Sequence, residues 1–152
     1  MIKTLSVSAI QNGTVIDHIA SRQALRIISL LRLLDKKLKV TVGLNLPSKR
    51  MQLKDIIKIE NHILTNEEAN EVTIFAPEAT INIIQNFEVT NKITTTTPST
   101  IASVFICPNT VCITRIEPVD SFFMIEEQGQ KVTLTCKYCE KSFDRNKVKV
   151  RI

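Results

Sequence analysis

Four cysteines near the C-terminal end constrain the fold more than any other feature of this sequence. They form two close pairs, Cys107 with Cys112 and Cys136 with Cys139, in the patterns C-x4-C and C-x2-C. Two such pairs, joined by a short strand-rich segment, supply the four thiolates of a tetrahedral zinc site, in which each sulfur lies about 2.3 Å from the ion. The spacing therefore predicts one structural zinc ion that organises a small C-terminal unit.

Two disulfide bonds are the alternative use of these cysteines. The N-terminal segment MIKTLSVSAI lacks the long apolar stretch of a secretory signal, so we expect a cytoplasmic protein in a reducing compartment. Paired cysteines in that setting usually bind metal. A catalytic zinc would keep an open position and would usually recruit His, Asp or Glu, but the two histidines, His18 and His62, lie far upstream. We therefore expect no catalysis at this metal.

The charge of the chain is positive but dispersed. The net charge of +5 divides into +3 over residues 1–100 and +2 over residues 101–152, with no dense basic segment. A nucleic-acid binder more often carries a dense basic stripe, and this mild basicity fits a small anionic ligand or an acidic protein partner just as well. The most apolar stretch, Leu25 to Leu34, is short and contains Arg26 and Arg32, so the sequence predicts no membrane span.

The segment from Lys92 to Thr100 is polar, rich in threonine and contains a proline, which is typical of a linker. It separates two regions of different composition. We predict an N-terminal domain over residues 1–97 and a zinc domain over residues 98–152.

Apolar periodicity in the first half alternates between strand and helix. Strands are predicted over residues 5–10, 14–16, 39–46, 55–60, 72–75 and 80–84. Ser21 is the expected N-cap of a helix whose apolar face carries Ala24, Ile27, Ile28, Leu31 and Leu34. Residues 47–50, which include Pro47, are expected to end the strand over residues 39–46. Thr65 and Glu68 form a capping-box pattern that predicts a second, short acidic helix.

This order of elements predicts an α+β protein. The first domain approximates β-α-β-β-α-β with one extra C-terminal strand, which is the ferredoxin-like sandwich of a sheet with helices on one face. The cysteine region shows no helical periodicity. Short antiparallel strands are expected there over residues 104–106, 122–125 and 132–135, around the metal.

Motifs for enzymatic chemistry are absent from the sequence. No glycine-rich phosphate loop, nucleophile elbow or zinc-protease motif occurs, and the cysteines are assigned to the metal. One segment of the first domain, GTVIDHI at 13–19, has binding potential, because Asp17 suits ribose hydroxyls and His18 suits a phosphate. From the residues alone, a solvated turn is the stronger interpretation of this pair. Lys58 and Lys92 are ordinary surface lysines unless the fold directs them at one ligand.

Several longer motifs resemble the aspartate carbamoyltransferase regulatory chain family, in register over nearly the whole chain. They are GTVIDHI (13–19), GLNLPS (43–48), KDIIKIEN (54–61), APEATINIIQNFEV (76–89), CPNTVC (107–112) and CKYCEK (136–141). The resemblance implies a non-catalytic subunit in pyrimidine biosynthesis. In this family an N-terminal domain binds CTP, ATP or UTP, and a zinc domain docks onto a separate catalytic chain. Three regulatory homodimers bridge two catalytic trimers.

The resemblance also implies an effector site in this chain. Ala9 and Ile10 would contact the edge of the base. Asp17 and Lys58 would hold ribose and base oxygens, and His18 and Lys92 would hold the phosphates. The remaining wall would be lined by Asn82, Ile84, Phe87 and Val89. With no glycine loop, separate cations must hold the triphosphate, and two lysines and a histidine can do so.

For the docking surface, the resemblance points to residues around the metal. Asn109 lies inside the first cysteine pair, and the residues around the second pair are Lys137, Tyr138, Glu140 and Lys141. Zinc would then act indirectly, by folding the surface that meets the catalytic chain. The alternative function is a zinc-ribbon accessory protein that binds nucleic acid, which the metal site and the basic pI of about 9.1 would support. The dispersed charge favours the regulatory chain and predicts no nucleic-acid partner.

Overall fold

The computed structural model describes residues 9–151 and divides into two compact units, Met1–Thr96 and Thr97–Ile152. Each unit has its own β-structure and its own buried core. Within residues 9–151, no helix combines the length and the apolar character that crossing a membrane requires.

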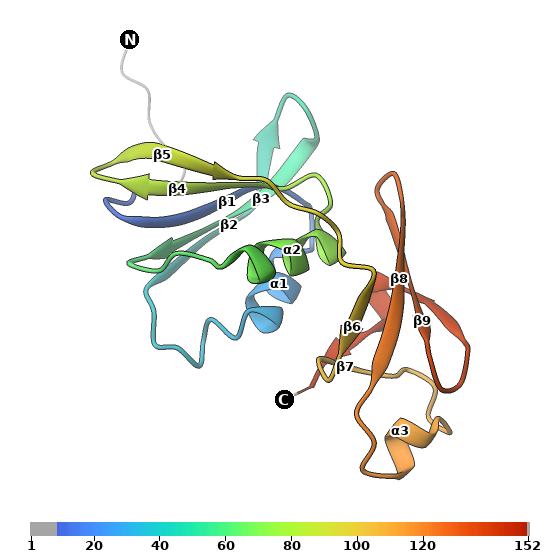
Figure 1. Ribbon diagram of the computed structural model, residues 1–152. Coiled ribbons are helices and arrows are strands. Elements are labelled where there is room, and N and C mark those ends of the chain that lie inside the picture. Colours follow the sequence, from blue (N-terminus) through green and yellow to red (C-terminus); the bar gives the residue numbers. More distant parts are fainter. Residues whose placement is uncertain (1–8, 152) are drawn as a thin grey trace. The chain divides into compact units, whose positions relative to one another are not determined.

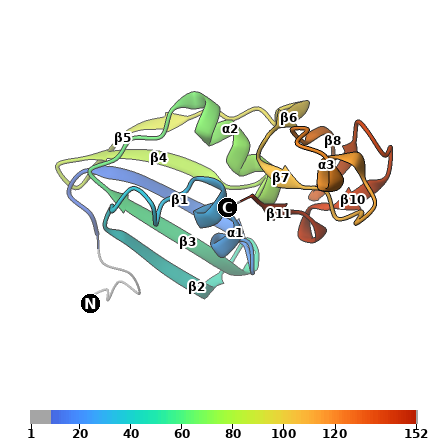
Figure 2. The same ribbon diagram turned by 90° about the horizontal axis from the view of Figure 1, so that it is seen from below.

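The first unit is built on a five-stranded antiparallel sheet with the strand order β2-β3-β1-β4-β5 (Figure 1). Its strands are β1 (Gly13–Ala20), β2 (Val40–Ser48), β3 (Gln52–Glu60), β4 (Thr80–Gln85) and β5 (Glu88–Ile93). Two helices, α1 (Ala24–Leu30) and α2 (Asn66–Phe75), lie on one face of this sheet, as Figures 1 and 2 show. The order β1-α1-β2-β3-α2-β4 confirms the ferredoxin-like arrangement, and β5 is the extra strand at one edge.

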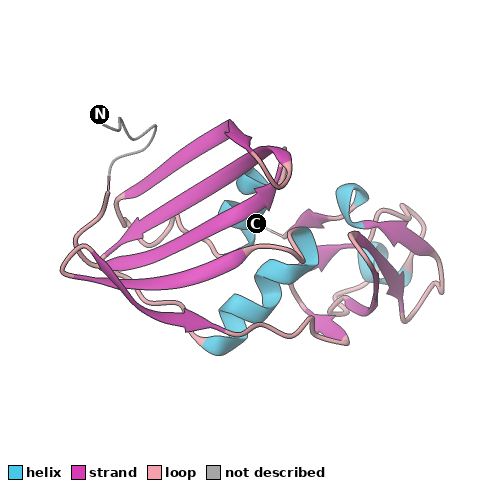
Figure 3. Cartoon of the chain, turned by 90° about the horizontal axis from the view of Figure 1, so that it is seen from above, coloured by secondary structure: helices cyan, strands magenta, loops and turns pink. Residues whose placement is uncertain are grey.

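Strand alternation places the core between this sheet and its helices. Ile16, Ile57 and Ile81, on three neighbouring strands, are at most 2% exposed and pair in one row across the sheet. Because side chains alternate between the faces of a strand, the residues next to these three point to the opposite face. Among residues 9–151 no helix lies on that opposite face, which we call the open face (Figure 3).

The segment from Val72 to Phe75 is helical, which corrects the strand predicted there. Its β-branched residues suggest a strand locally, but the capping box at Thr65 starts α2, and the helix continues to Phe75. Ala69, Val72 and Phe75, spaced at three residues, are buried. Pro77 follows shortly after, and a proline restricts the residue before it away from helical geometry. Burial of an apolar helix face outweighs the local strand preference here.

Ser21 is not the N-cap of α1. The cap residue is Gln23, which makes no side-chain cap hydrogen bond, and the Ser21 hydroxyl donates instead to Asn45 Oδ1 at 2.5 Å. The backbone N–H groups at the start of the helix donate instead to a side chain of another strand. Asp55 Oδ2, on β3, accepts from the backbone N–H groups of Arg22 at 3.1 Å and Ala24 at 3.4 Å.

Several strand boundaries differ from prediction. The expected strand over residues 5–10 lies mostly outside the described residues, and Ala9 and Ile10 are not in a strand. β1 extends to Ala20, beyond the predicted 14–16. β2 runs through Pro47 to Ser48, which an edge strand tolerates because some of its N–H groups face solvent. Lys92 belongs to β5 rather than to a linker.

The second unit contains a four-stranded sheet and a two-stranded sheet. The first has the order β10-β9-β8-β6 and the second pairs β11 with β7. Their strands are β6 (Thr100–Ala102), β7 (Phe105–Ile106), β8 (Phe122–Gln128), β9 (Lys131–Cys136), β10 (Ser142–Asp144) and β11 (Lys149–Val150). A four-residue helix, α3 (Ile113–Ile116), follows the first cysteine pair. The fully buried rings of Phe105 and Phe123 pack edge to face, with centroids 6.3 Å apart.

Candidate functional site

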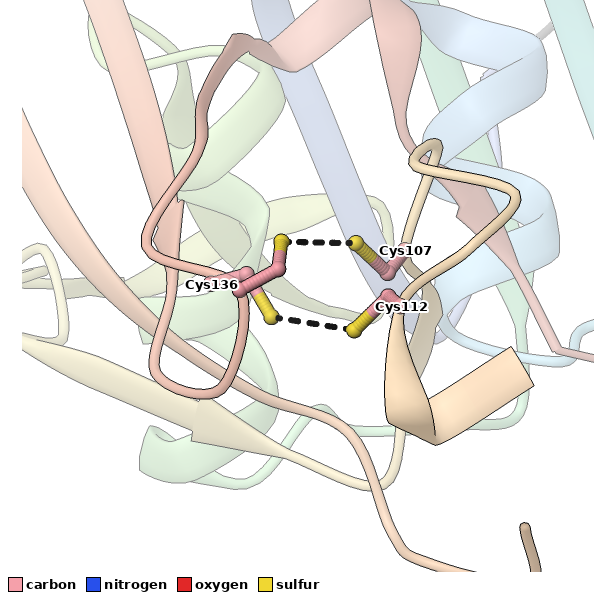
Figure 4. Close-up of side chains that lie close together, drawn as sticks. Cys107, Cys112 and Cys136 are labelled. Carbon is pink, nitrogen blue, oxygen red and sulfur yellow. Dashed lines mark hydrogen bonds between the residues drawn. The ribbon is translucent and has the colours of Figure 1, made fainter. Parts of the chain in front are cut away.

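The four cysteines converge on one point. Cys107 follows β7, Cys112 is the N-cap of α3, Cys136 ends β9, and Cys139 lies in the turn before β10. Their sulfur atoms all lie within 4.8 Å of one another, and Figure 4 shows the two pairs directed across the centre. The prediction that these four residues form one cluster is confirmed.

The sulfur geometry fits a zinc ion. Cys107 Sγ lies 3.7 Å from Cys139 Sγ, and Cys112 Sγ lies 3.8 Å from Cys136 Sγ. A regular tetrahedron with zinc–sulfur bonds of about 2.3 Å has edges of about 3.8 Å, so both separations match such a site. Disulfide bonds are excluded at these distances, because bonded sulfur atoms lie about 2.05 Å apart. All four cysteines are free thiols.

Backbone hydrogen bonds hold each cysteine pair in a tight turn. In the first pair, Cys112 N–H donates to the Asn109 carbonyl at 3.0 Å. In the second pair, Glu140 N–H donates to the Cys136 carbonyl at 2.9 Å, with Glu140 in the left-handed region at φ 61°. These turns place both thiols of each pair on the same side of the chain.

The thiols require a cation to ionise together. Burial raises the pKa of Cys107 to about 12. Burial also acts on Cys139, but the Asn109 side chain and the Lys141 amide outweigh it and lower the pKa of Cys139 to about 7. Four adjacent thiolates repel one another, so a divalent ion must compensate them. With four sulfur ligands and no open position, the site is structural.

The surface around the metal site combines apolar and charged side chains. The exposed apolar residues there are Val111, Ile113, Ile116 and Tyr138, of which Val111 is 73% exposed. Among the predicted docking residues, Lys137, Glu140 and Lys141 are exposed, and Asn109 is half-buried. The ammonium group of Lys137 lies 5.0 Å from the centre of the Phe122 ring.

A second group of predicted site residues shares one row of the open face. Val15 on β1 pairs with Lys58 on one side and Asn82 on the other, and Asn82 in turn pairs with Lys92. Paired residues of an antiparallel sheet project to the same face, so these side chains are neighbours. The fold thus brings together two lysines and an amide from three separate segments.

Asp17 and His18 sit at an irregularity in β1, where the pairing with β3 shifts between Ile16 and Ile19. His18 has φ 57°, and its Nδ1 lies 3.0 Å from Thr80 Oγ1. Asp17 Oδ1 lies 3.0 Å from Lys54 Nζ, with both side chains about one-fifth exposed. Such a bulge changes the direction of the side chains at this point of β1, beside the row of Lys58, Asn82 and Lys92.

Lys54 was missed by the sequence reasoning. Lys54 lies on β3, four residues before Lys58. Because side chains alternate along a strand, this even spacing predicts that both lysines project to the same face. Burial lowers the pKa of Lys58, and the nearby Asp17 carboxylate partly offsets that effect. The Asp17 carboxylate thus interacts with two lysines of β3, Lys54 and Lys58.

The remaining predicted residues lie toward the β4–β5 turn. Ile84 pairs with Gly13 and with Val89, so it lies next to the Asn82 row. Phe87 is 63% exposed at the tip of the turn, with φ 67°. Its N–H donates to the Gln11 carbonyl at 2.9 Å, which holds the turn beside the segment that contains Ala9 and Ile10. Ile10 is buried and Ala9 is exposed.

Asn82 has an unusual environment on the open face. Its Oδ1 atom is buried and finds no hydrogen-bond partner among the described residues. A buried amide oxygen without a partner costs free energy unless a ligand or water supplies a donor. The atom is therefore a feature that a bound polar ligand would satisfy.

Comparison with known proteins assigns both units. Residues 5–96 match the family model described as the aspartate carbamoyltransferase regulatory chain, allosteric domain. Residues 99–149 match the metal binding domain of the same chain. The matches do not favour the alternative, a zinc-ribbon protein that binds nucleic acid.

Individual relatives agree with this assignment over almost their whole length. The chain is 49% identical to the aspartate carbamoyltransferase regulatory chain of Photorhabdus laumondii, over 95% of this chain and 94% of that one. It is 50% identical to that of Baumannia cicadellinicola, over 95% and 92%, and 49% identical to that of Yersinia pseudotuberculosis, over 92% and 91%. The chain belongs to the aspartate carbamoyltransferase regulatory chain family, and it is a non-catalytic allosteric subunit that serves a separate catalytic chain.

Proposed function

We propose that the open face of the first unit binds a nucleoside triphosphate, with CTP, ATP and UTP as the effectors. The row of Lys58, Asn82 and Lys92 is the observation that supports this most directly. The lysines, with His18, supply separate positive groups for a triphosphate where no glycine-rich loop is present. Asp17 accepts from ribose hydroxyls, and Asn82 Oδ1 gains a donor that it lacks within the described residues.

The base is assigned to the side of this row that faces the β4–β5 turn. Ile84, Phe87 and Val89 provide apolar surface there, and the backbone at Ala9 and Ile10 provides polar groups for the base edge. The ring of Phe87 is exposed at the tip of a two-residue hairpin turn, in which Asn86 and Phe87 both have the positive φ that such a turn requires, so the turn presents the ring to a ligand.

The effector acts through a difference in affinity. A nucleotide that bound both quaternary states of the holoenzyme equally would shift nothing, so it must prefer one of them. The coupling free energy expected for such control is about 1–3 kcal/mol and is reciprocal for binding. The signal reaches the catalytic chain through the surface around the metal, with Asn109, Lys137, Tyr138, Glu140 and Lys141 as contacts.

We also propose that two regulatory chains pair, and that three such dimers join two catalytic trimers in the cytoplasm. β2 lies at an edge of its sheet, contains no charged residue, and exposes 48% of Leu44. An uncharged edge strand is a template for pairing with another strand. Sedimentation equilibrium of the isolated chain tests this, and a monomer at all accessible concentrations would contradict it.

The nucleotide site is tested by calorimetric titration of the Lys92→Ala variant with CTP. Loss of a charged contact to phosphate, at about 1.5–3 kcal/mol, should weaken binding by about tenfold or more. Lys49→Ala is the matched control, because Lys49 is an exposed lysine in the β2–β3 turn of the same unit. Zinc content should be the same in both variants. Unchanged CTP affinity in Lys92→Ala would remove this residue from the site.

A further inference from the structure

The side chain of Thr114 is buried against the metal centre. Thr114 is 7% exposed, and its hydroxyl donates to Cys112 Sγ at 3.2 Å. Cys112 itself is 2% exposed, so little solvent reaches its sulfur. A buried hydroxyl needs an acceptor, and a buried thiolate needs a donor to offset its lost hydration. The Thr114 hydroxyl is one such donor to Cys112 Sγ, and the backbone N–H of Thr114 is a second.

The position of this hydroxyl is fixed by the local backbone. Cys112 is the N-cap of α3, and the N–H of Arg115 donates to its carbonyl at 2.9 Å. The guanidinium Nη1 of Arg115 donates to the Cys107 carbonyl at 2.8 Å, which ties the helix to the other cysteine of the pair. Thr114 lies within this short, doubly anchored segment, so its hydroxyl is directed at the sulfur by the fold of the first cysteine pair.

We propose that Thr114 is a positioning residue of the metal centre, whose hydroxyl orients the Cys112 thiolate and slows the loss of the ion. A thiolate bound to one metal ion keeps lone pairs that can accept a hydrogen bond. The O–H···S bond withdraws charge from the sulfur and reduces its repulsion with the other three thiolates. It also restricts rotation of the Cys112 side chain. This role concerns retention of the metal and does not depend on nucleotide binding.

The test compares Thr114→Val, which removes the hydroxyl and keeps the shape, with Thr114→Ser, which keeps the hydroxyl and removes the methyl group. Zinc transfer from the full-length chain to a chromogenic chelator is timed for each protein. Loss of a hydrogen bond to a metal ligand typically weakens metal binding by about 10–100-fold. We expect zinc release from Thr114→Val to accelerate within that range, and release from Thr114→Ser to stay close to the original rate.

A second measurement separates the hydrogen bond from packing. After replacement of zinc by Co²⁺, the sulfur-to-cobalt charge-transfer band should move to lower energy in Thr114→Val and remain in place in Thr114→Ser. If Thr114→Val retains no metal, a Thr114→Ser variant that does retain it supports the proposal. An unchanged rate of zinc release from Thr114→Val, or an equal increase of that rate in both variants, would overturn the proposal.

Discussion

Asp55 is a carboxylate with no solvent exposure that is satisfied by backbone amides from two other segments. Its Oδ1 accepts from Asn45 N–H at 2.9 Å, where the pairing of β2 with β3 shifts register. Its Oδ2 accepts from the N–H groups of Arg22 and Ala24 at the start of α1. One side chain thus joins a strand irregularity to a helix N-terminus, where a negative charge also meets the positive end of the helix dipole.

Replacement of Asp55 by alanine should lower the free energy of unfolding of the first unit by at least about 2 kcal/mol, because buried amides without partners cost about 1–3 kcal/mol each. Urea unfolding followed by circular dichroism measures the change. Asp35→Ala is the control, since Asp35 has a side chain that is 74% exposed and a single 3.8 Å ion pair with Arg32. Similar stability of both variants would show that the amides find other partners.

At the scale of elements, α2 illustrates how a local signal positions a helix. Thr65 Oγ1 accepts from Glu68 N–H at 3.1 Å, and Glu68 Oε1 accepts from Thr65 N–H at 3.1 Å. The Glu68 carboxylate also meets Lys36 at 3.2 Å. Burial tends to raise the pKa of Glu68, but the Thr65 amide, Lys36 and His62 outweigh it and lower that pKa. The ionised Glu68 carboxylate therefore stabilises the fold at pH values above the ordinary pKa of glutamate. This contribution is lost as the pH falls through the lowered pKa that Glu68 has in the folded protein.

Substitution of Thr65 by alanine removes the cap acceptor and should cost about 1 kcal/mol. Thr65→Ser keeps the hydroxyl and should differ from the original chain by only a few tenths of a kcal/mol. Chemical denaturation of the three proteins at neutral pH gives both differences. A serine variant as unstable as the alanine variant would assign the effect to the threonine methyl group rather than to the cap.

On the scale of the whole molecule, the two units rely on different sources of stability. The first unit buries a sheet face under two helices, whereas the second is small and contains a cluster of four cysteine thiols. Binding of a structural zinc ion contributes about 10–16 kcal/mol in small domains, which exceeds the stability of most complete domains. The second unit should therefore fold only with its metal, and the first should not need it.

Removal of zinc by a chelator should abolish assembly with catalytic chains and unfold residues 97–152 selectively. The chain has one tyrosine, Tyr138, and no tryptophan, so tyrosine emission reports on the metal site alone. Hydrogen exchange of the first unit should stay protected. Because metal binding displaces thiol protons, zinc should leave more readily as the pH falls. Cooperative loss of protection in both units together would contradict this independence.

Much of the candidate site followed from the sequence because its signals are local. The cysteine spacing specifies a four-thiolate centre, because one tight turn in each pair is enough to direct both of its thiols at the same ion. Thr65 and Glu68 specify a helix start because the capping bonds span only three residues. The family motifs extend in register across both units, and both assignments from the comparisons agree with them.

Only the tertiary structure decided features that depend on distant residues. The residues from Val72 to Phe75 have strand propensity, but burial against the sheet makes them helical. Ser21 precedes α1 as an N-cap residue would, but the Asp55 carboxylate on β3 accepts the hydrogen bonds of the backbone N–H groups there instead. The row of Lys58, Asn82 and Lys92 exists only through strand register, which no single segment encodes. Local hydrogen bonds and ligand spacing are thus determined by the sequence, whereas competition for burial and pairing between strands is resolved only when the chain folds.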